Sequence, residues 1–238
     1  MPELHSHVLL VVAHPDPSSL THHVAQDLQA VLKQWGTVET ADLQREGFDP
    51  RWSPEDRLCY QGLGEVPADV VAEQHRLDRA TDVVLVFPVY WWSMPALAKG
   101  WVDRVFINGW AFDYDLIDGL RPKLQQLTVH VVPVAASDAG LYERHEYEKA
   151  MRIQVEHGLV DFCGAARGAM TFVYDSEDPS EEIRAARGRA AVEEISAHFA
   201  ARVAAAPCDR LVGKRFVAHI RSELQHLCLG KDASLTQP

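Results

Sequence analysis

The stretch DVVLVFPVYWWS, residues 82–93, decides the fold, because it is a short valine-rich apolar run that ends in a proline and three aromatic residues. Such a run is typical of a strand that is buried on both faces, as the strands of a parallel sheet are. A similar run, VLLVVA, occupies residues 8–13, and apolar residues at helical spacing follow it at residues 20–32. We therefore expect two buried parallel strands, each leading through a loop into a helix.

Strand-like and helix-like segments alternate along the rest of the chain. Further strands are expected at residues 38–43, 127–134 and 169–174, and further helices at residues 67–80, 95–105, 143–156 and 180–203. This alternation predicts an α/β three-layer sandwich, with helices on both faces of a five-stranded parallel sheet in the order 2-1-3-4-5. In such sheets ligands bind beyond the carboxyl ends of the strands, here at the switch between strands 1 and 3.

We expect this sheet domain to span residues 1–206, followed by a C-terminal extension at residues 207–238. Residues 209–229 place apolar side chains on one helical stripe, which predicts an extra helix before a frayed tail. Residues 44–66 hold several glycines and prolines without sustained periodicity, which predicts a long irregular segment. Asp103 and Arg104 are expected to form ordinary surface or helix-end contacts.

Composition narrows the class of protein. The chain has 23 Lys and Arg against 34 Asp and Glu, a formal charge of −11, which disfavours nucleic acid as a partner. No apolar run approaches the roughly 20 residues needed to cross a bilayer, and the first residues lack the layout of a secretory signal. The four cysteines show no C-x-x-C spacing and fit a reducing, cytoplasmic location.

The loop after the first strand reads HPDPSSLT, residues 14–21. Its hydroxyl and N–H groups stand at the start of a helix, where the helix dipole favours an anion such as a phosphate. The loop matches neither the G-x-G-x-x-G pattern nor the P-loop pattern. A simpler alternative is that Ser18 or Ser19 only caps the helix. His14 has no neighbouring ligands at metal-site spacing, so no metal is expected.

The loop after the central strand, PVYWWS at residues 88–93, is aromatic where a loop is normally polar. A flat aromatic cofactor would explain this composition, with backbone N–H groups meeting its edge and aromatic side chains lying against its face. The alternatives are a hydrophobic plug or a dimer surface.

Three stretches resemble the NAD(P)H:quinone oxidoreductase family of flavodoxin-like flavoproteins: VVAHPDPSSLTHHVA at 11–25, PADVVAEQHRLDRATDVVLV at 67–86 and FPVYWWSMPALAKGWVDRVFINGWAFDY at 87–114. The resemblance covers about residues 7–200, and it is strong through Tyr114 and weaker beyond. It includes bacterial quinone reductases and ancillary subunits of potassium efflux systems. It implies a flavodoxin-like fold, FAD or FMN with FAD preferred, and a homodimer with active sites at the subunit interface. It also implies NADPH or NADH as reductant and a quinone-like acceptor.

The same resemblance assigns residues to a site. The residues implied to contact the flavin phosphates and ribityl chain are His14, Ser18, Leu20 and Thr21. The residues implied to hold the isoalloxazine ring are Pro88, Val89, Tyr90, Trp91 and Trp92. Phe112 and Tyr114 would lie over the acceptor, reaching in from the other subunit.

The third flavin loop departs from the family, which usually carries Thr-Thr-Gly-Gly where this chain has PVAAS at residues 133–137. Backbone amides at Ala135 and Ala136 can still serve, although alanine restricts the backbone more than glycine does. The tyrosine and histidine that donate protons in the family map onto Tyr142 and His145, with Tyr147 competing for the second position. Without the resemblance, Tyr142 and His145 are more typical of a helix surface.

The resemblance implies an enzyme in which hydride passes from NAD(P)H to the flavin and then to the acceptor, with ping-pong kinetics. Tyr142 and His145 would stabilise charge and relay protons. A rival hypothesis is a flavin-binding regulatory module that contacts a partner such as a potassium efflux transporter. The helix expected at 209–229 and the altered loop at Ala135 and Ala136 motivate it. A hydrolase is disfavoured because G-x-S-x-G is absent.

Overall fold

The computed structural model describes residues 6–117 and 119–205, and it confirms the predicted sheet. Five parallel strands run in the order β2-β1-β3-β6-β7, which is the expected order 2-1-3-4-5 once a separate two-stranded hairpin is set aside. The strands are β1 (Ser6–Val12), β2 (Gly36–Asp42), β3 (Asp82–Pro88), β6 (Thr128–Val134) and β7 (Ala166–Met170). Of the described residues, those up to Ala200 form one compact unit that contains the sheet.

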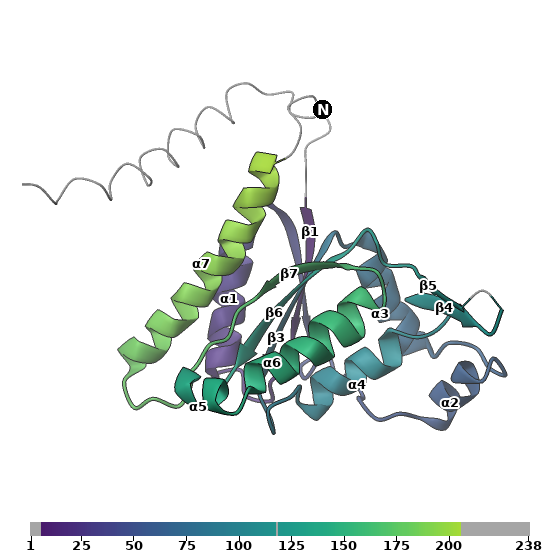
Figure 1. Ribbon diagram of the computed structural model, residues 1–238, viewed down its shortest axis with the longest axis horizontal. Coiled ribbons are helices and arrows are strands. Elements are labelled where there is room, and N and C mark those ends of the chain that lie inside the picture. Colours follow the sequence, from purple (N-terminus) through teal and green to yellow (C-terminus); the bar gives the residue numbers. More distant parts are fainter. Residues whose placement is uncertain (1–5, 118, 206–238) are drawn as a thin grey trace, which may run out of the picture. The chain divides into compact units, whose positions relative to one another are not determined.

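Helices cover both faces of the sheet (Figure 1). One face carries α1 (Leu20–Leu32) and α7 (Glu181–Ala205). The other carries α3 (Ala68–Arg79), α4 (Ala96–Val105) and α6 (Tyr147–Arg152), which continues as the π-helix η1 (Ile153–Asp161).

The alternation of side chains along β1 shows why its buried part, from Val8 to Val12, must be apolar. Val8 and Leu10 pack into the layer of α1 and α7, whereas Leu9 and Val11 pack into the layer of α3 and α4. All of these side chains are buried, and each contributes about 1.5–3 kcal/mol through the apolar surface removed from water. The sheet therefore forms a rigid platform whose carboxyl edge positions the loops beyond it.

Four details differ from the sequence-based expectations. The segment at 44–66 is not wholly irregular, because Ser53 and Asp56 form a capping box that starts α2 (Pro54–Tyr60). The helix expected at 143–156 is instead broken into α5 (Ala139–Arg144), α6 and η1, with Glu146 in the left-handed region at φ 55°. Strand β7 begins three residues earlier than expected. A hairpin of β4 (Phe112–Asp115) and β5 (Gly119–Pro122), which the sequence did not predict, follows α4.

The helix expected at 209–229, and with it the boundary between residues 206 and 207, lies outside the described residues. Within 6–117 and 119–205, no helix has the length and apolar character required to cross a bilayer.

Candidate functional site

Three loops meet at the carboxyl edge of the sheet, where the topology places a ligand. They follow β1 (residues 14–21), β3 (residues 88–93) and β6 (residues 135–138). Neighbouring strands hold them together: Ala13 N donates to Val86 O at 3.1 Å, and Val89 N donates to Val134 O at 2.8 Å. The structure therefore brings together the three segments that the sequence assigned to cofactor binding.

The first loop is organised around Asp16. Its carboxylate accepts hydrogen bonds from both the N–H and the hydroxyl of Ser18, each at 2.8 Å, and these bonds lower the pKa of Asp16. The Nδ1 atom of His14 lies 3.0 Å from Asp16 N and 3.2 Å from Asp16 O, so the Asp16 backbone meets this ring nitrogen whether it accepts or donates. Partial burial lowers the pKa of His14. His14 therefore directs its Nε2 edge away from the Asp16 backbone.

Helix α1 begins with a cap that joins two further side chains. Ser19, rather than Ser18, is the N-cap residue, and its Oγ accepts from the backbone N–H of His22 at 3.3 Å. The His22 ring also lies between Ser19 Oγ, 3.1 Å from Nδ1, and the Asp42 carboxylate, 3.2 Å from Nε2. Sequence reasoning missed His22 and Asp42. The available signal was an acidic residue at the end of β2, beside β1 in the sheet.

The N–H groups of Leu20 and Thr21 lie in the first turn of α1, where the helix itself supplies no acceptor. They point along the helix axis toward the loop, where the positive end of the helix dipole favours an anion. The Ser18 hydroxyl, in contrast, already donates to the Asp16 carboxylate.

The second loop is a two-residue turn with strained backbone. Tyr90 and Ser93 exchange two backbone hydrogen bonds of 3.1 Å, and Trp91 and Trp92 between them have φ angles of 50° and 56°. Positive φ at both central residues defines a type I′ turn, which normally favours glycine or asparagine. A non-glycine residue in this region costs about 1–3 kcal/mol and is typically retained where function requires it. Among the described residues, none accepts a hydrogen bond from the N–H groups of Trp91 and Trp92.

An aromatic stack joins this turn to the segment after β6. Trp92 stacks on Tyr147 with ring centroids 4.3 Å apart, and Tyr147 stacks on His145 at 5.2 Å. Tyr142 meets the edge of Tyr147 at 6.0 Å. The structure thus places Tyr142 and His145 in one cluster with the second loop. Tyr147, the alternative to His145 in the sequence analysis, lies between these two residues and Trp92.

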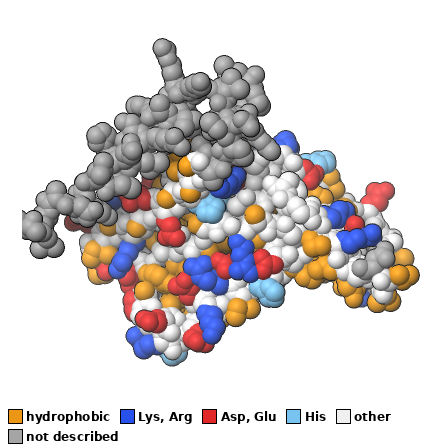
Figure 2. Space-filling model, turned by 45° about the horizontal axis from the view of Figure 1, so that its top comes forward, with side chains coloured by type: hydrophobic (Ala, Val, Ile, Leu, Met, Phe, Trp, Pro, Cys, Tyr) orange, Lys and Arg blue, Asp and Glu red, His pale blue; other side chains and the backbone are white. Residues whose placement is uncertain are grey.

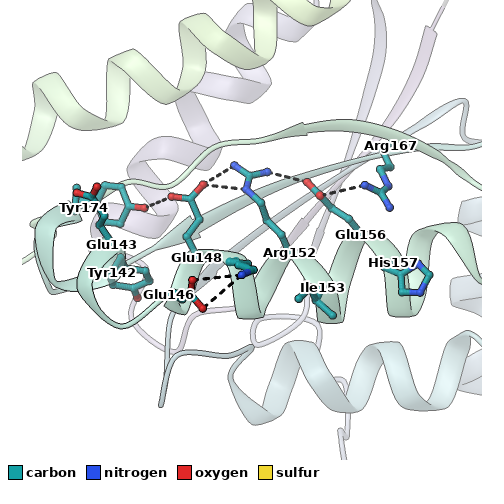
Figure 3. A pocket seen from close by; sticks show the side chains of 12 residues that line it. Tyr142, Glu143, Glu146, Glu148, Arg152, Ile153, Glu156, His157, Arg167 and Tyr174 are labelled. Carbon is teal, nitrogen blue, oxygen red and sulfur yellow. Dashed lines mark hydrogen bonds and ion pairs between the residues drawn. The ribbon is translucent and has the colours of Figure 1, made fainter.

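Tyr142 is buried, yet its ring lines a groove of about 610 Å³ (Figure 3). Burial raises the pKa of Tyr142 to about 12, so its hydroxyl keeps its proton at neutral pH. The wall of the groove is a chain of paired side chains: Tyr174 donates to Glu148 at 2.7 Å, and Arg152 bridges Glu148 and Glu156. This wall fixes the groove beside Tyr142 and leaves its charged groups paired.

Two predicted residues do not join the three loops. Phe112 and Tyr114 lie on β4, in the hairpin at the far right of Figure 1. Phe112 packs against Phe162 with ring centroids 4.9 Å apart, whereas Tyr114 is exposed. In the described part of the chain, no ring contact joins these two aromatic side chains to the three loops.

The donor set of the three loops fits a flavin. It offers uncharged N–H groups at Trp91 and Trp92 and helix-end N–H groups on α1 for phosphates, together with an aromatic stack at one side. A planar ring with carbonyl and ring-nitrogen acceptors requires this kind of environment. Among residues 6–117 and 119–205, no cluster of three or more His, Cys, Asp or Glu side chains could hold a metal ion.

The chain resembles several known proteins. Residues 6–199 match the family described as having a flavodoxin-like fold. Ribosyldihydronicotinamide dehydrogenase (quinone) of Rattus norvegicus is 31% identical over 201 residues, a match that covers 74% of this chain and 85% of the relative.

Two solved structures share the fold. NAD(P)H:quinone oxidoreductase from Methanothermobacter marburgensis has a TM-score of 0.73 and 24% identity, and covers 79% of this chain and 96% of that chain. The FMN-dependent NADH-azoreductase of Bacillus anthracis, in complex with FMN, has a TM-score of 0.59 and 18% identity, and covers 81% of this chain and 98% of that chain. The protein is an oxidoreductase and belongs to the flavodoxin-like family that includes the NAD(P)H:quinone oxidoreductases.

Proposed function

We propose that the protein is a flavin-dependent NAD(P)H oxidoreductase that reduces quinones or related electrophilic acceptors. The observation that carries this proposal is the strained turn at 91–92, which holds two indoles and two free N–H groups beside the start of α1. The names of the quinone-reducing relatives and of the FMN-bound azoreductase support it.

The residues of the three loops take distinct roles in this proposal. The phosphate and ribityl part of the cofactor is held by His14, Ser18, Leu20 and Thr21. The ring is held by Pro88, Val89, Tyr90, Trp91, Trp92, Ala135 and Ala136. We favour FAD, with FMN as the alternative, because the segment at 44–66 is long enough to meet an adenine. A flavin held by these residues would supply two-electron redox chemistry between NADPH or NADH and the acceptor.

Tyr142 stabilises the negative charge that develops during this transfer. Its raised pKa, about 12, keeps the hydroxyl protonated, so it can donate a hydrogen bond toward the groove. His145 is the second candidate for the proton relay, and it reaches the cluster through its stack on Tyr147. The reductant and the acceptor use the same place in turn, which predicts ping-pong kinetics.

We further propose that the active form is a homodimer. Leu116 and Ile117, at the tip of the β4–β5 hairpin, are both 94% exposed, and Figure 2 shows hydrophobic side chains gathered around that tip. Exposed apolar patches of this kind commonly mark an interface. Docking of the hairpin on a second copy would bring Phe112 and Tyr114 to the partner's acceptor. Light scattering on a Leu116→Glu variant tests this, since a dimer that persists unchanged would contradict it.

The decisive experiment is the visible spectrum of the purified protein, followed by identification of the released chromophore. We expect a flavin absorbance band and rapid oxidation of NADPH or NADH with menadione as acceptor. Double-reciprocal plots at several acceptor concentrations should give parallel lines. A folded protein that stays colourless after incubation with FAD and with FMN would refute the proposal, and intersecting lines would refute the shared place for the two substrates.

A further inference from the structure

The side chains of Ser19, His22 and Asp42 form a relay beneath the proposed phosphate end of the site. His22 and Asp42 are only 8% and 9% exposed, and their atoms Nε2 and Oδ2 lie 3.2 Å apart. The second carboxylate oxygen of Asp42 accepts the backbone N–H of Arg45 at 3.1 Å, which fixes the carboxylate. Only Ser19, at the other end of the relay, belongs to the first loop.

The geometry gives the Ser19 hydroxyl two alternative directions. When His22 is neutral, the proton on Nε2 donates to Asp42, and Nδ1 is left as an acceptor for the Ser19 O–H. When His22 is protonated, Nδ1 becomes a donor to Ser19 Oγ, so the Ser19 proton must point elsewhere. The outward direction is the one in which Ser19 can donate to an anion at the start of α1.

We propose that His22 is a positioning residue that couples binding of the flavin phosphates to its own protonation, through the direction of the Ser19 hydroxyl. This inference rests on the proposed function, because the anion is the phosphate part of the flavin. A ligand phosphate favours the outward hydroxyl, and the outward hydroxyl favours the protonated ring. The affinity for a phosphorylated flavin therefore rises as the pH falls from 8 to 6, whereas the affinity for riboflavin, which has no phosphate, does not.

Other titratable or charged groups face the relay and must be separated from it. The His14 ring meets the His22 ring edge-on with centroids 6.1 Å apart, and the Asp16 carboxylate lies in the same loop. Arg45 Nε lies 4.0 Å from Asp42 Oδ2 and is exposed. All of these groups remain in a variant that changes only His22, so a comparison of pH profiles isolates the relay.

The test measures the dissociation constants of FAD and riboflavin at pH 6 and pH 8 by flavin fluorescence, using protein stripped of flavin. FAD is the better probe than FMN because its diphosphate lacks the second ionisation near pH 6 of a phosphate monoester. In the wild type we expect FAD to bind roughly fivefold more tightly at pH 6 than at pH 8. The change for riboflavin should be less than about twofold.

Two variants and one control decide the outcome. His22→Asn keeps a polar group near Ser19 but cannot become charged, and Ser19→Ala removes the hydroxyl while leaving His22 paired with Asp42. Both should lose the pH dependence of FAD binding. His23→Gln, which changes the exposed neighbour on the same helix, should retain it. Circular dichroism confirms that each variant is folded.

The failures are distinguishable. If the folded wild type binds neither FAD nor riboflavin, the proposed function fails and this inference fails with it. If the wild type binds FAD and the His22→Asn and Ser19→Ala variants keep its pH dependence, the proposed function stands and the relay is refuted. A wild type whose FAD affinity is the same at both pH values also refutes the relay.

Discussion

Arg104 provides a direct test of how helix α4 is held in the fold, because its guanidinium joins this helix to α2, to α3 and to the loop before α2. Its side chain is 5% exposed, and Nε donates to Asp56 Oδ2 at 2.9 Å. Its terminal nitrogens donate to the Asp69 carboxylate and, at 2.7 Å, to Asp49 O. The guanidinium also lies over the Phe48 ring at 5.3 Å. The sequence-based expectation of an ordinary surface or helix-end contact was therefore wrong.

The expected loss of stability in Arg104→Met follows from the carboxylate that the substitution leaves unpaired. Asp56 is 3% exposed, so its carboxylate would remain buried without its counter-ion, which destabilises a protein by about 3–5 kcal/mol. The pair with Asp69 adds little because Asp69 is about half exposed. Arg104→Lys keeps the charge but loses the planar set of donors, so we expect roughly half of the loss.

The lowered pKa of Asp56 determines how the stabilisation from the Arg104–Asp56 pair changes with pH. Burial raises the pKa of Asp56, but hydrogen bonds from Arg104 and Ser53 outweigh it and leave the pKa below the ordinary value. The stabilisation from this pair is therefore present at neutral pH and is lost as the pH falls through the lowered pKa. In Arg104→Met, burial still raises the pKa of Asp56, but the arginine no longer lowers it. Asp56 therefore takes up a proton on acidification, and the cost of burying an unpaired carboxylate disappears. The difference between variant and wild type must shrink toward acidic pH.

Urea unfolding of the flavin-free protein at pH 7.5 and pH 4, followed by tryptophan fluorescence, measures both effects. Arg51→Met is the matched control, since Arg51 pairs with Asp49 on the same segment but is fully exposed to solvent. It should leave the unfolding midpoint unchanged. An Arg104→Met protein within about 1 kcal/mol of wild type at pH 7.5, where a buried unpaired carboxylate should cost more, would refute the reasoning. So would a deficit that grows at pH 4.

Three further changes test the site and the core. Trp92→Ala removes the stack on Tyr147 and should weaken FAD binding about tenfold in a fluorescence titration; an unchanged dissociation constant would count against the stack. Tyr142→Phe should keep the FAD affinity but slow flavin reduction by roughly 10²-fold in stopped-flow experiments. Because the Tyr142 pKa is about 12, the wild-type rate should show no titration of this group below pH 9. Gly168→Ala places a Cβ 2.5 Å from His130 Nδ1 and should lower stability by about 3 kcal/mol in urea unfolding, so an unaltered midpoint would contradict the packing.

The sheet was predictable because its signal is strong and local. Residues 83–88 are apolar and buried without interruption, and the helix at 20–32 has the bounds that its apolar spacing predicts. The rule that crossovers are right-handed left few topologies, and the order favoured among them is the one that the structure has. By contrast, the break at Glu146 depends on one residue in the left-handed region, and no periodicity reveals that.

The site was predictable only in part. The loops at 14–21 and 88–93 could be found from the sequence, the first because hydroxyl residues stand at the start of a helix and the second because three aromatic residues follow a buried strand. The relay does not stand out, because Asp42 lies 20 residues from His22 and only the pairing of β1 with β2 brings the two together. Arg104 was misread for the same reason. Its partners lie 35 and 48 residues away, and spacing along its own helix gave no sign of them.

The left-handed backbone at Trp91 and Trp92 has a consequence for laboratory evolution. Glycine or asparagine at either position would relax the turn, so a screen for thermostability alone should enrich these replacements. Each such replacement would discard an indole of the loop that we propose holds the flavin ring. Heat-resistant clones from that screen should therefore include proteins that are more stable and yet purify without colour. A screen that also scores yellow colour should keep both tryptophans.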